Sequence, residues 1–95
     1  MTHTLAAAAR FELEVRKSRF LVHADTIDAP EGAHAFLAGV ADAGATHNCW
    51  AYRIGQQYRS SDDGEPTGTA GRPILAAIDG QGFDQVVVVV TRWYG

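Results

Sequence analysis

Apolar and charged residues alternate at the start of the segment 11–22, which is the pattern of a strand with one buried face. The alternating residues are Phe11, Leu13 and Val15 against Glu12, Glu14 and Arg16. Successive side chains of a strand point to opposite faces, so the pattern predicts one strand over 11–22, with a bend at Lys17-Ser18. Further strands are predicted over three ranges: 47–54, 57–60 and 83–93. The last of these contains an unbroken run of valines and suits the centre of a sheet.

Two other segments carry the signals of amphipathic helices. Apolar residues recur at helical spacing in the first, and Asp28 as N-cap and Gly44 as C-terminal glycine predict a helix over 29–43. The second helix is predicted to begin near Thr69, as its N-cap, and to end at Gly80.

The predicted order of elements is strand, helix, strand, strand, helix, strand. Helices that interleave with strands in this way favour packing of the helices on one face of a sheet. We therefore expect an α+β fold: a two-layer α/β sandwich with two helices and about four strands in a mixed or antiparallel sheet.

Composition narrows the class of protein. The chain has 95 residues and a net charge of −3, which predicts a single domain over 1–95 and counts against general binding of nucleic acids. The lone cysteine, Cys49, gives no sign of an oxidising compartment, and no apolar run is long enough to span a bilayer. We expect a cytoplasmic protein without membrane contact. Because the chain stops directly after a strong strand, we also expect the domain to be truncated at its C-terminal end.

Three stretches carry more information than folding requires. They are HNCWAYRIG at 47–55, SSDDGEPTGTAGRPIL at 60–75 and VVVVVTRWYG at 86–95. Together with KSRF at 17–20, they resemble the N-terminal domain of the YigZ/IMPACT family over roughly residues 10–95. The DDGEP-x-GTAG run is the most specific part of this resemblance.

The resemblance implies a fold similar to domain IV of elongation factor G. It also implies a binding domain linked to the regulation of translation, because the eukaryotic relatives compete for the activator of the amino-acid-starvation kinase. The partners it implies are RNA, the ribosome or a translation-regulatory protein, and no cofactor is expected. We expect this sequence to lack the further C-terminal domain that bacterial family members carry.

The acidic, glycine-rich loop at 61–71 has three interpretations. Its glycines and the helix N-terminus that follows favour binding of an anion, to which Arg72 adds a charged contact. Its carboxylates are also the hard oxygen ligands of a divalent cation, and its glycines and threonines equally suit a tight turn and a helix cap. The loop residues proposed for binding are Asp62, Asp63, Glu65, Thr67, Thr69 and Arg72.

Two further sets of residues complete the candidates. His47 and Cys49 share one face of a predicted strand, where they suit core packing better than a thiolate nucleophile or a metal site. Arg53, Arg59 and Arg92, with nearby aromatic residues, form a candidate surface for RNA. The leading hypothesis is a translation-linked binding module. The alternative is a metal-dependent hydrolase that uses the polar loop and His47.

Overall fold

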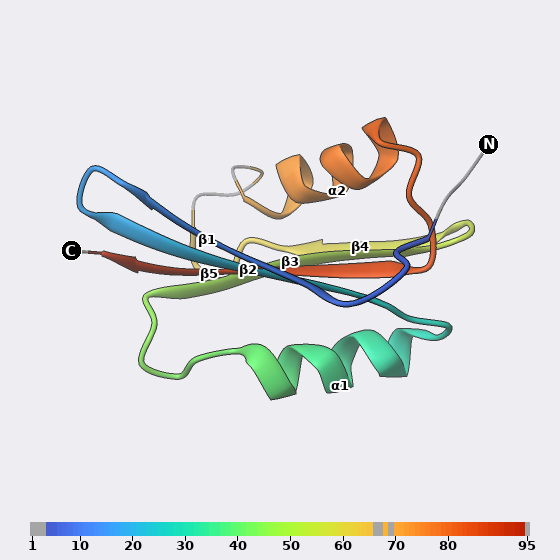
Figure 1. The fold of residues 1–95 in the computed structure, drawn as a ribbon, viewed down its shortest axis with the longest axis horizontal. Coiled ribbons are helices and arrows are strands. Elements are labelled where there is room, and N and C mark those ends of the chain that lie inside the picture. The colour runs from blue at the N-terminus through green and yellow to red at the C-terminus, as the bar shows by residue number, and fades with distance from the viewer. Residues whose placement is uncertain (1–3, 66–67, 69, 95) are drawn as a thin grey trace.

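The computed structural model describes residues 4–65, 68 and 70–94, and these fold around one sheet (Figure 1). The strands are β1 (Ala9–Val15), β2 (Ser18–Thr26), β3 (His47–Ile54), β4 (Gln57–Ser61) and β5 (Val86–Tyr94), and the helices are α1 (Pro30–Val40) and α2 (Gly71–Gly80). The spatial order is β1-β2-β5-β3-β4, and every neighbouring pair is antiparallel. This arrangement confirms the predicted α+β class. Within the described residues, no helix is long and apolar enough to cross a membrane.

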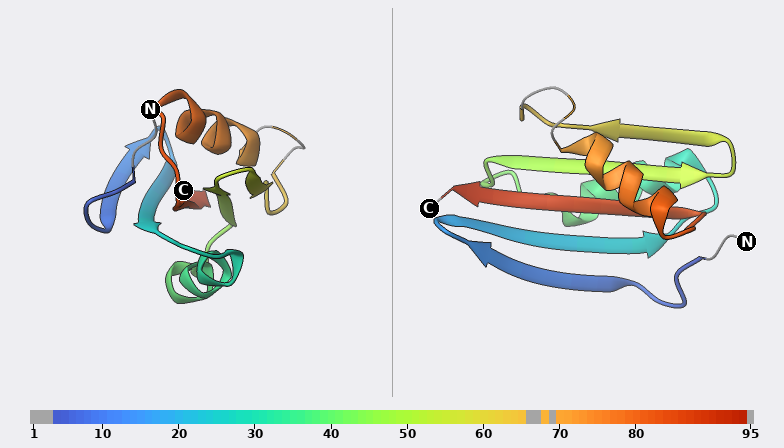
Figure 2. Two further views of the ribbon diagram at one scale, coloured as in Figure 1. Left: turned by 90° about the vertical axis from the view of Figure 1, so that its right-hand side faces the viewer. Right: turned by 90° about the horizontal axis from the view of Figure 1, so that it is seen from above.

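The two helices cover opposite faces of the sheet, as Figures 1 and 2 show. Val87 and Val89 of β5 belong to the core cluster under α1, whereas Val86 and Val88 belong to the cluster under α2. Because the valine run of β5 has no polar alternate, both faces of this central strand need apolar cover. We expected two layers, with both helices on one face of the sheet. The structure instead has one helix on each face.

The larger core cluster lies between α1 and the sheet. Phe36, Leu37 and Val40 of the helix pack against a buried set made of Ile27, Ala33, Tyr52, Val87 and Val89. The cluster on the other face is smaller and centres on Ala51, Ile78 and Val86. Helix α2 contacts mainly β3 and β4, so it covers only part of its face.

The predicted strand over 11–22 is a hairpin instead. The chain turns at Arg16-Lys17, and β1 then pairs with β2 from Val15↔Ser18 outward. Arg16 has a positive φ of 57°, as the first central residue of a type II′ turn requires, and this turn matches the twist of the two strands. Apolar and polar residues alternate on both sides of the turn, so the two-residue period of the strands did not reveal the turn. The hairpin raises the strand count from about four to five.

A side chain from β3 ends α1 before the predicted limit of 29–43. The Asn48 amide donates to the Asp42 carbonyl oxygen, and the Asn48 side-chain oxygen accepts from the Asp42 N–H, both at 3.0 Å. Ala41 is already extended, with ψ at 140°. Gly44 therefore lies beyond the helix and does not cap it.

The N-cap of α1 is not the residue that the sequence predicted. The N-cap of α1 is Ala29 instead of Asp28, and the N-cap of α2 is Ala70, in both cases without a side-chain hydrogen bond from the cap itself. Thr69, the predicted cap of α2, lies outside the described residues. The group that caps α2 comes from the end of β4.

Replacing Arg16 with glycine is expected to stabilise the domain. A non-glycine residue in the left-handed region costs about 1–2 kcal/mol, and glycine adopts it freely at an entropic cost of about 0.5–1 kcal/mol. Arg16→Gly should therefore raise the free energy of unfolding by about 0.5–1 kcal/mol in urea denaturation. Lys17→Gly in the same turn is the control. Because φ is not positive at Lys17, this variant should have a lower free energy of unfolding than the wild type. A Lys17→Gly variant that is more stable than Arg16→Gly would contradict this assignment of the turn.

Candidate functional site

The carboxylate of Asp62 occupies the N-terminus of α2. It accepts hydrogen bonds from the backbone N–H groups of Gly68 (2.9 Å), Ala70 (3.0 Å) and Gly71 (2.7 Å). The N–H groups of Gly68, Gly71 and Ala70, in that order of effect, lower the pKa of Asp62 below its usual value. The helix end that the sequence offered to an external anion is thus filled by the protein's own carboxylate.

Gly71 makes this cap possible because α2 begins directly against β4. A Cβ atom at Gly71 would lie 2.8 Å from the backbone nitrogen of Ser61 and 2.9 Å from its carbonyl carbon and oxygen. No larger residue fits without moving the backbone of the helix or of the strand. The glycine is therefore required by close approach.

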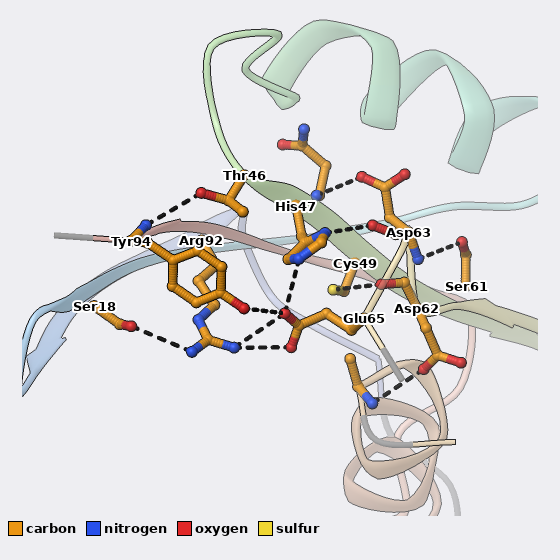
Figure 3. A network of polar contacts seen from close by, with 12 residues as sticks. Ser18, Thr46, His47, Cys49, Ser61, Asp62, Asp63, Glu65, Arg92 and Tyr94 are labelled. Atoms are coloured by element: carbon orange, nitrogen blue, oxygen red, sulfur yellow. Dashed lines mark hydrogen bonds and ion pairs between the residues drawn. The ribbon is translucent and has the colours of Figure 1, made fainter. Parts of the chain in front are cut away.

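Glu65 is the centre of a second set of contacts, shown in Figure 3. One of its carboxylate oxygens lies 3.0 Å from His47 Nε2 and accepts from the Tyr94 hydroxyl at 3.1 Å. Arg92 donates to both oxygens, at 3.0 and 2.9 Å. The Glu65 side chain is only 11% exposed, so these contacts replace most of its water. They tie the loop to β3 and to the end of β5.

Arg92 is held in place from its other side as well. It donates to the Ser18 hydroxyl at 3.2 Å, and its guanidinium lies 4.3 Å from the centroid of the Tyr94 ring and 5.3 Å from that of Phe20. Stacking on these rings fixes the plane of the guanidinium. The network therefore joins β2, β3 and β5 to the loop.

Asp63 fastens the loop to the start of β3. Its carboxylate accepts from the Asn48 N–H at 2.7 Å, and its carbonyl oxygen lies 2.6 Å from His47 Nδ1. A carbonyl oxygen can only accept, so Nδ1 carries the hydrogen in this contact. Asp63 adopts a positive φ of 44°, a conformation that aspartate tolerates better than most residues.

Comparison with known proteins identifies the family of this domain. Residues 16–95 match the family model described as the Impact N-terminal domain. This chain belongs to that family.

Curated relatives carry the same family name. An IMPACT family member of Thermus thermophilus is 53% identical over 81 residues, which are 85% of this chain and 45% of that protein. The IMPACT family member YigZ of Escherichia coli is 43% identical over 86% of this chain and 44% of its own length, and the mouse Protein IMPACT is 37% identical over 84% and 28%. The chain spans about half the length of the bacterial relatives that it matches.

A solved structure has the same fold. It is titled "Crystal structure of an hypothetical protein", and it superposes with a TM-score of 0.92 at 41% sequence identity. The superposition covers 97% of this chain and 48% of the other chain.

The three arginines predicted to form one surface of this Impact N-terminal domain lie apart. Arg53 sits opposite Val86, six positions along β5 from Arg92, which is a distance of about 20 Å along a strand. Arg53 forms an ion pair with Asp79 of α2. Arg59 sits opposite Tyr52 and therefore points to the α1 face. The predicted arginine surface is not formed as one patch.

Cys49 is buried and points toward the polar loop. Its thiol donates to the Asp62 carbonyl oxygen at 3.2 Å. Burial, followed by the negative charges of Glu65 and Asp63, raises the pKa of the thiol to about 11. The nearby His47 contacts Glu65 and Asp63 with its two ring nitrogens, so the structure agrees with core packing of the cysteine and shows no activated thiolate.

The loop carboxylates do not form a metal site in the described part of the chain. Asp62, Asp63 and Glu65 each bind different groups of the protein, and no cluster of three or more His, Cys, Asp or Glu residues that could hold an ion occurs there. Thr67 and Thr69 lie outside the described residues. Arg72 is exposed in the first turn of α2.

The sequence did not indicate that three further residues complete the network: Ser18, Asn48 and Tyr94. Tyr94 shares a face of β5 with Arg92 two positions earlier, so the period of the strand could have found it. Ser18 meets Arg92 only because β2 pairs with β5, and nothing local in the sequence indicates that pairing.

Asp62→Asn is expected to destabilise the domain in a pH-dependent way. Because the pKa of Asp62 is lower in the folded state, its carboxylate stabilises the fold at every pH above the unfolded-state pKa, and this stabilisation is lost as the pH falls through the folded-state pKa. The melting temperature should fall in the variant at pH 5–7, and the difference from the wild type should shrink below about pH 4. Asp28→Asn is the control and should show no such profile. A difference that persists unchanged in acid would contradict the capping role.

The thiol of Cys49 is expected to react slowly with alkylating agents. Its pKa of about 11 in place of 9.0 lowers the thiolate fraction about 100-fold at neutral pH, and burial slows access further. Iodoacetamide at pH 7.5 should label the native protein at least that much more slowly than the urea-unfolded chain, as followed by mass spectrometry. Equal rates in the two states would mean an exposed, reactive thiol.

Proposed function

We propose that this Impact N-terminal domain is a binding module for the translation machinery, and that it presents the loop at 62–72 to its partner. The observation that carries the proposal is the internal binding of the Asp62, Asp63 and Glu65 carboxylates, which holds these three residues in place before a partner arrives. A surface formed in advance loses less conformational entropy on association. Around this loop lie the exposed groups Asp63, Arg72 and Tyr94.

A small pocket beside the network supports the same interpretation. It has a volume of about 170 Å³, and Phe20, Ile74 and Arg92 are among the residues that line it. Arg92 Nε is buried and has no hydrogen-bond partner among the described residues. Burial of this donor without an acceptor is costly.

The contacts favour binding over hydrolysis. A hydrolase needs a nucleophile, a base or a metal that is free to act on a substrate. Here His47 is engaged at both ring nitrogens, and the Cys49 thiol is held protonated. The link to translation rests on the family resemblance, and RNA, the ribosome and a translation-regulatory protein are the partners that it supports.

Co-sedimentation with ribosomes tests the proposal, with two arginine variants as a matched pair. Arg72 borders the loop and Arg59 points to the α1 face, and both are exposed. Arg72→Glu and Arg59→Glu change the net charge equally, so a general charge effect would weaken both. We expect Arg72→Glu to lower affinity at least about tenfold and Arg59→Glu to change it less than about twofold, with steep loss on adding salt.

Two results would count against this proposal. Absence of co-sedimentation at low salt would exclude direct binding to the ribosome by this chain. Equal loss in both variants would exclude the loop as the contact surface. Repeating the assay with protein-free ribosomal RNA assigns a positive result to the RNA or to ribosomal proteins.

A further inference from the structure

Strand β1 is an edge strand of the sheet (Figure 2). It pairs with β2 along all seven of its residues, from Ala9 to Val15, without a bulge. It contains no proline. Opposite residues in an antiparallel ladder alternate between hydrogen-bonded and non-hydrogen-bonded pairs. The pair that flanks a two-residue turn, here Val15↔Ser18, is a hydrogen-bonded one. Residues 10, 12 and 14 therefore direct their backbone N–H and C=O groups away from β2, where a further strand can pair with them.

The two faces of β1 differ in chemistry. Phe11, Leu13 and Val15 lie on the α2 face, where they are 60%, 45% and 47% exposed. Arg10, Glu12 and Glu14 lie on the α1 face. Glu12 forms an ion pair with Arg19 of β2 at 2.8 Å. Arg10 and Glu14 form no ion pair with any residue that the structure describes.

The charged and apolar residues of one β1 strand are complementary to those of a second, antiparallel β1 strand. In an antiparallel pair of two β1 strands related by a twofold axis at Glu12, each Arg10 lies opposite the Glu14 of the other copy. Phe11 then lies opposite Leu13, and Ala9 opposite Val15, so each residue meets one on the same face. This register uses the full length of the strand, and its hydrogen-bonded pairs are those formed by residues 10, 12 and 14.

We propose that a second copy of this chain pairs with β1, edge to edge, in this register. The dimer is isologous, with one continuous sheet through both copies. It gives Arg10 and Glu14 their partners, and it joins the two exposed apolar strips into one surface. The two Glu12 side chains meet at the axis, where the Arg19 of each copy offsets their charge.

The interface is small, since only one strand of each copy takes part. We therefore expect a weak dimer, with a dissociation constant on the order of 10–100 µM at low salt. Sedimentation velocity from about 10 µM to about 1 mM covers this range. Added salt should weaken the dimer because its ion pairs are exposed. A wild-type chain that stays monomeric throughout this range would overturn the proposal.

Two single variants test the charge pairing directly. Arg10→Glu places two acidic side chains opposite each other at both pairs, and Glu14→Arg does the same with two basic side chains. Like charges directly opposite are destabilising, so each variant alone should dimerise at least about tenfold more weakly than the wild type. An equimolar mixture of the two restores an opposite-charge pair at both sites and should form a heterodimer.

The mixture also separates loss of pairing from loss of folding, because a misfolded variant would not regain association. Two monomeric variants that fail to associate on mixing would overturn the proposed register.

Oxidative cross-linking checks the twofold axis independently. In this register the two residues at position 12 face each other, with Cα atoms about 5.5 Å apart, which a disulfide can bridge. Glu12→Cys should therefore form a covalent dimer under mild oxidation. Phe11→Cys, whose two copies are offset by two residues, should do so at least about tenfold more slowly. The reverse order would place the axis at Phe11 and contradict the proposal.

Discussion

The candidate site depends on the ion pair between the Glu65 carboxylate and Arg92. Arg92 reaches the carboxylate from the central strand β5, and His47 reaches it from β3. Once Glu65 is fixed, Asp62 lies within reach of the start of α2 and Asp63 within reach of β3. Removing one partner of a buried ion pair leaves the other charge without compensation. The positions of these loop residues therefore depend on the sheet, and Glu65 in turn covers the polar end of β5 and β3.

The central strand β5 links this site to the fold. The valines of its first half pack into the core clusters on both faces of the sheet, and its second half turns polar on the α2 face at Arg92. Helix α2 starts against β4 because Gly71 permits it, and its N-terminus then meets Asp62. The acidic loop is thus a structural element whose charges are bound within the protein.

The sequence predicted much of this molecule because its signals are local. The strands, both helices and the family follow from periodicity and from motifs that lie close together in the chain. The hairpin at Arg16 was missed because no glycine or asparagine marks the turn. The opposite placement of the helices was missed because it depends on which strands pair. The contacts of Arg92 with Ser18 and of Glu65 with Tyr94 were missed, because they join segments that are distant in the sequence.

Amide hydrogen exchange of Glu65→Gln tests the central claim, with the exposed-residue variant Glu31→Gln as control. If Glu65 fixes the loop, the variant should lose protection at the N–H groups of Asn48, Ala70 and Gly71, which bind Asp63 and Asp62. The N–H groups in the middle of β5 should keep their protection, because local opening leaves the core intact. Unchanged protection at Asn48, Ala70 and Gly71 would contradict the account and show that the loop holds its shape without Glu65.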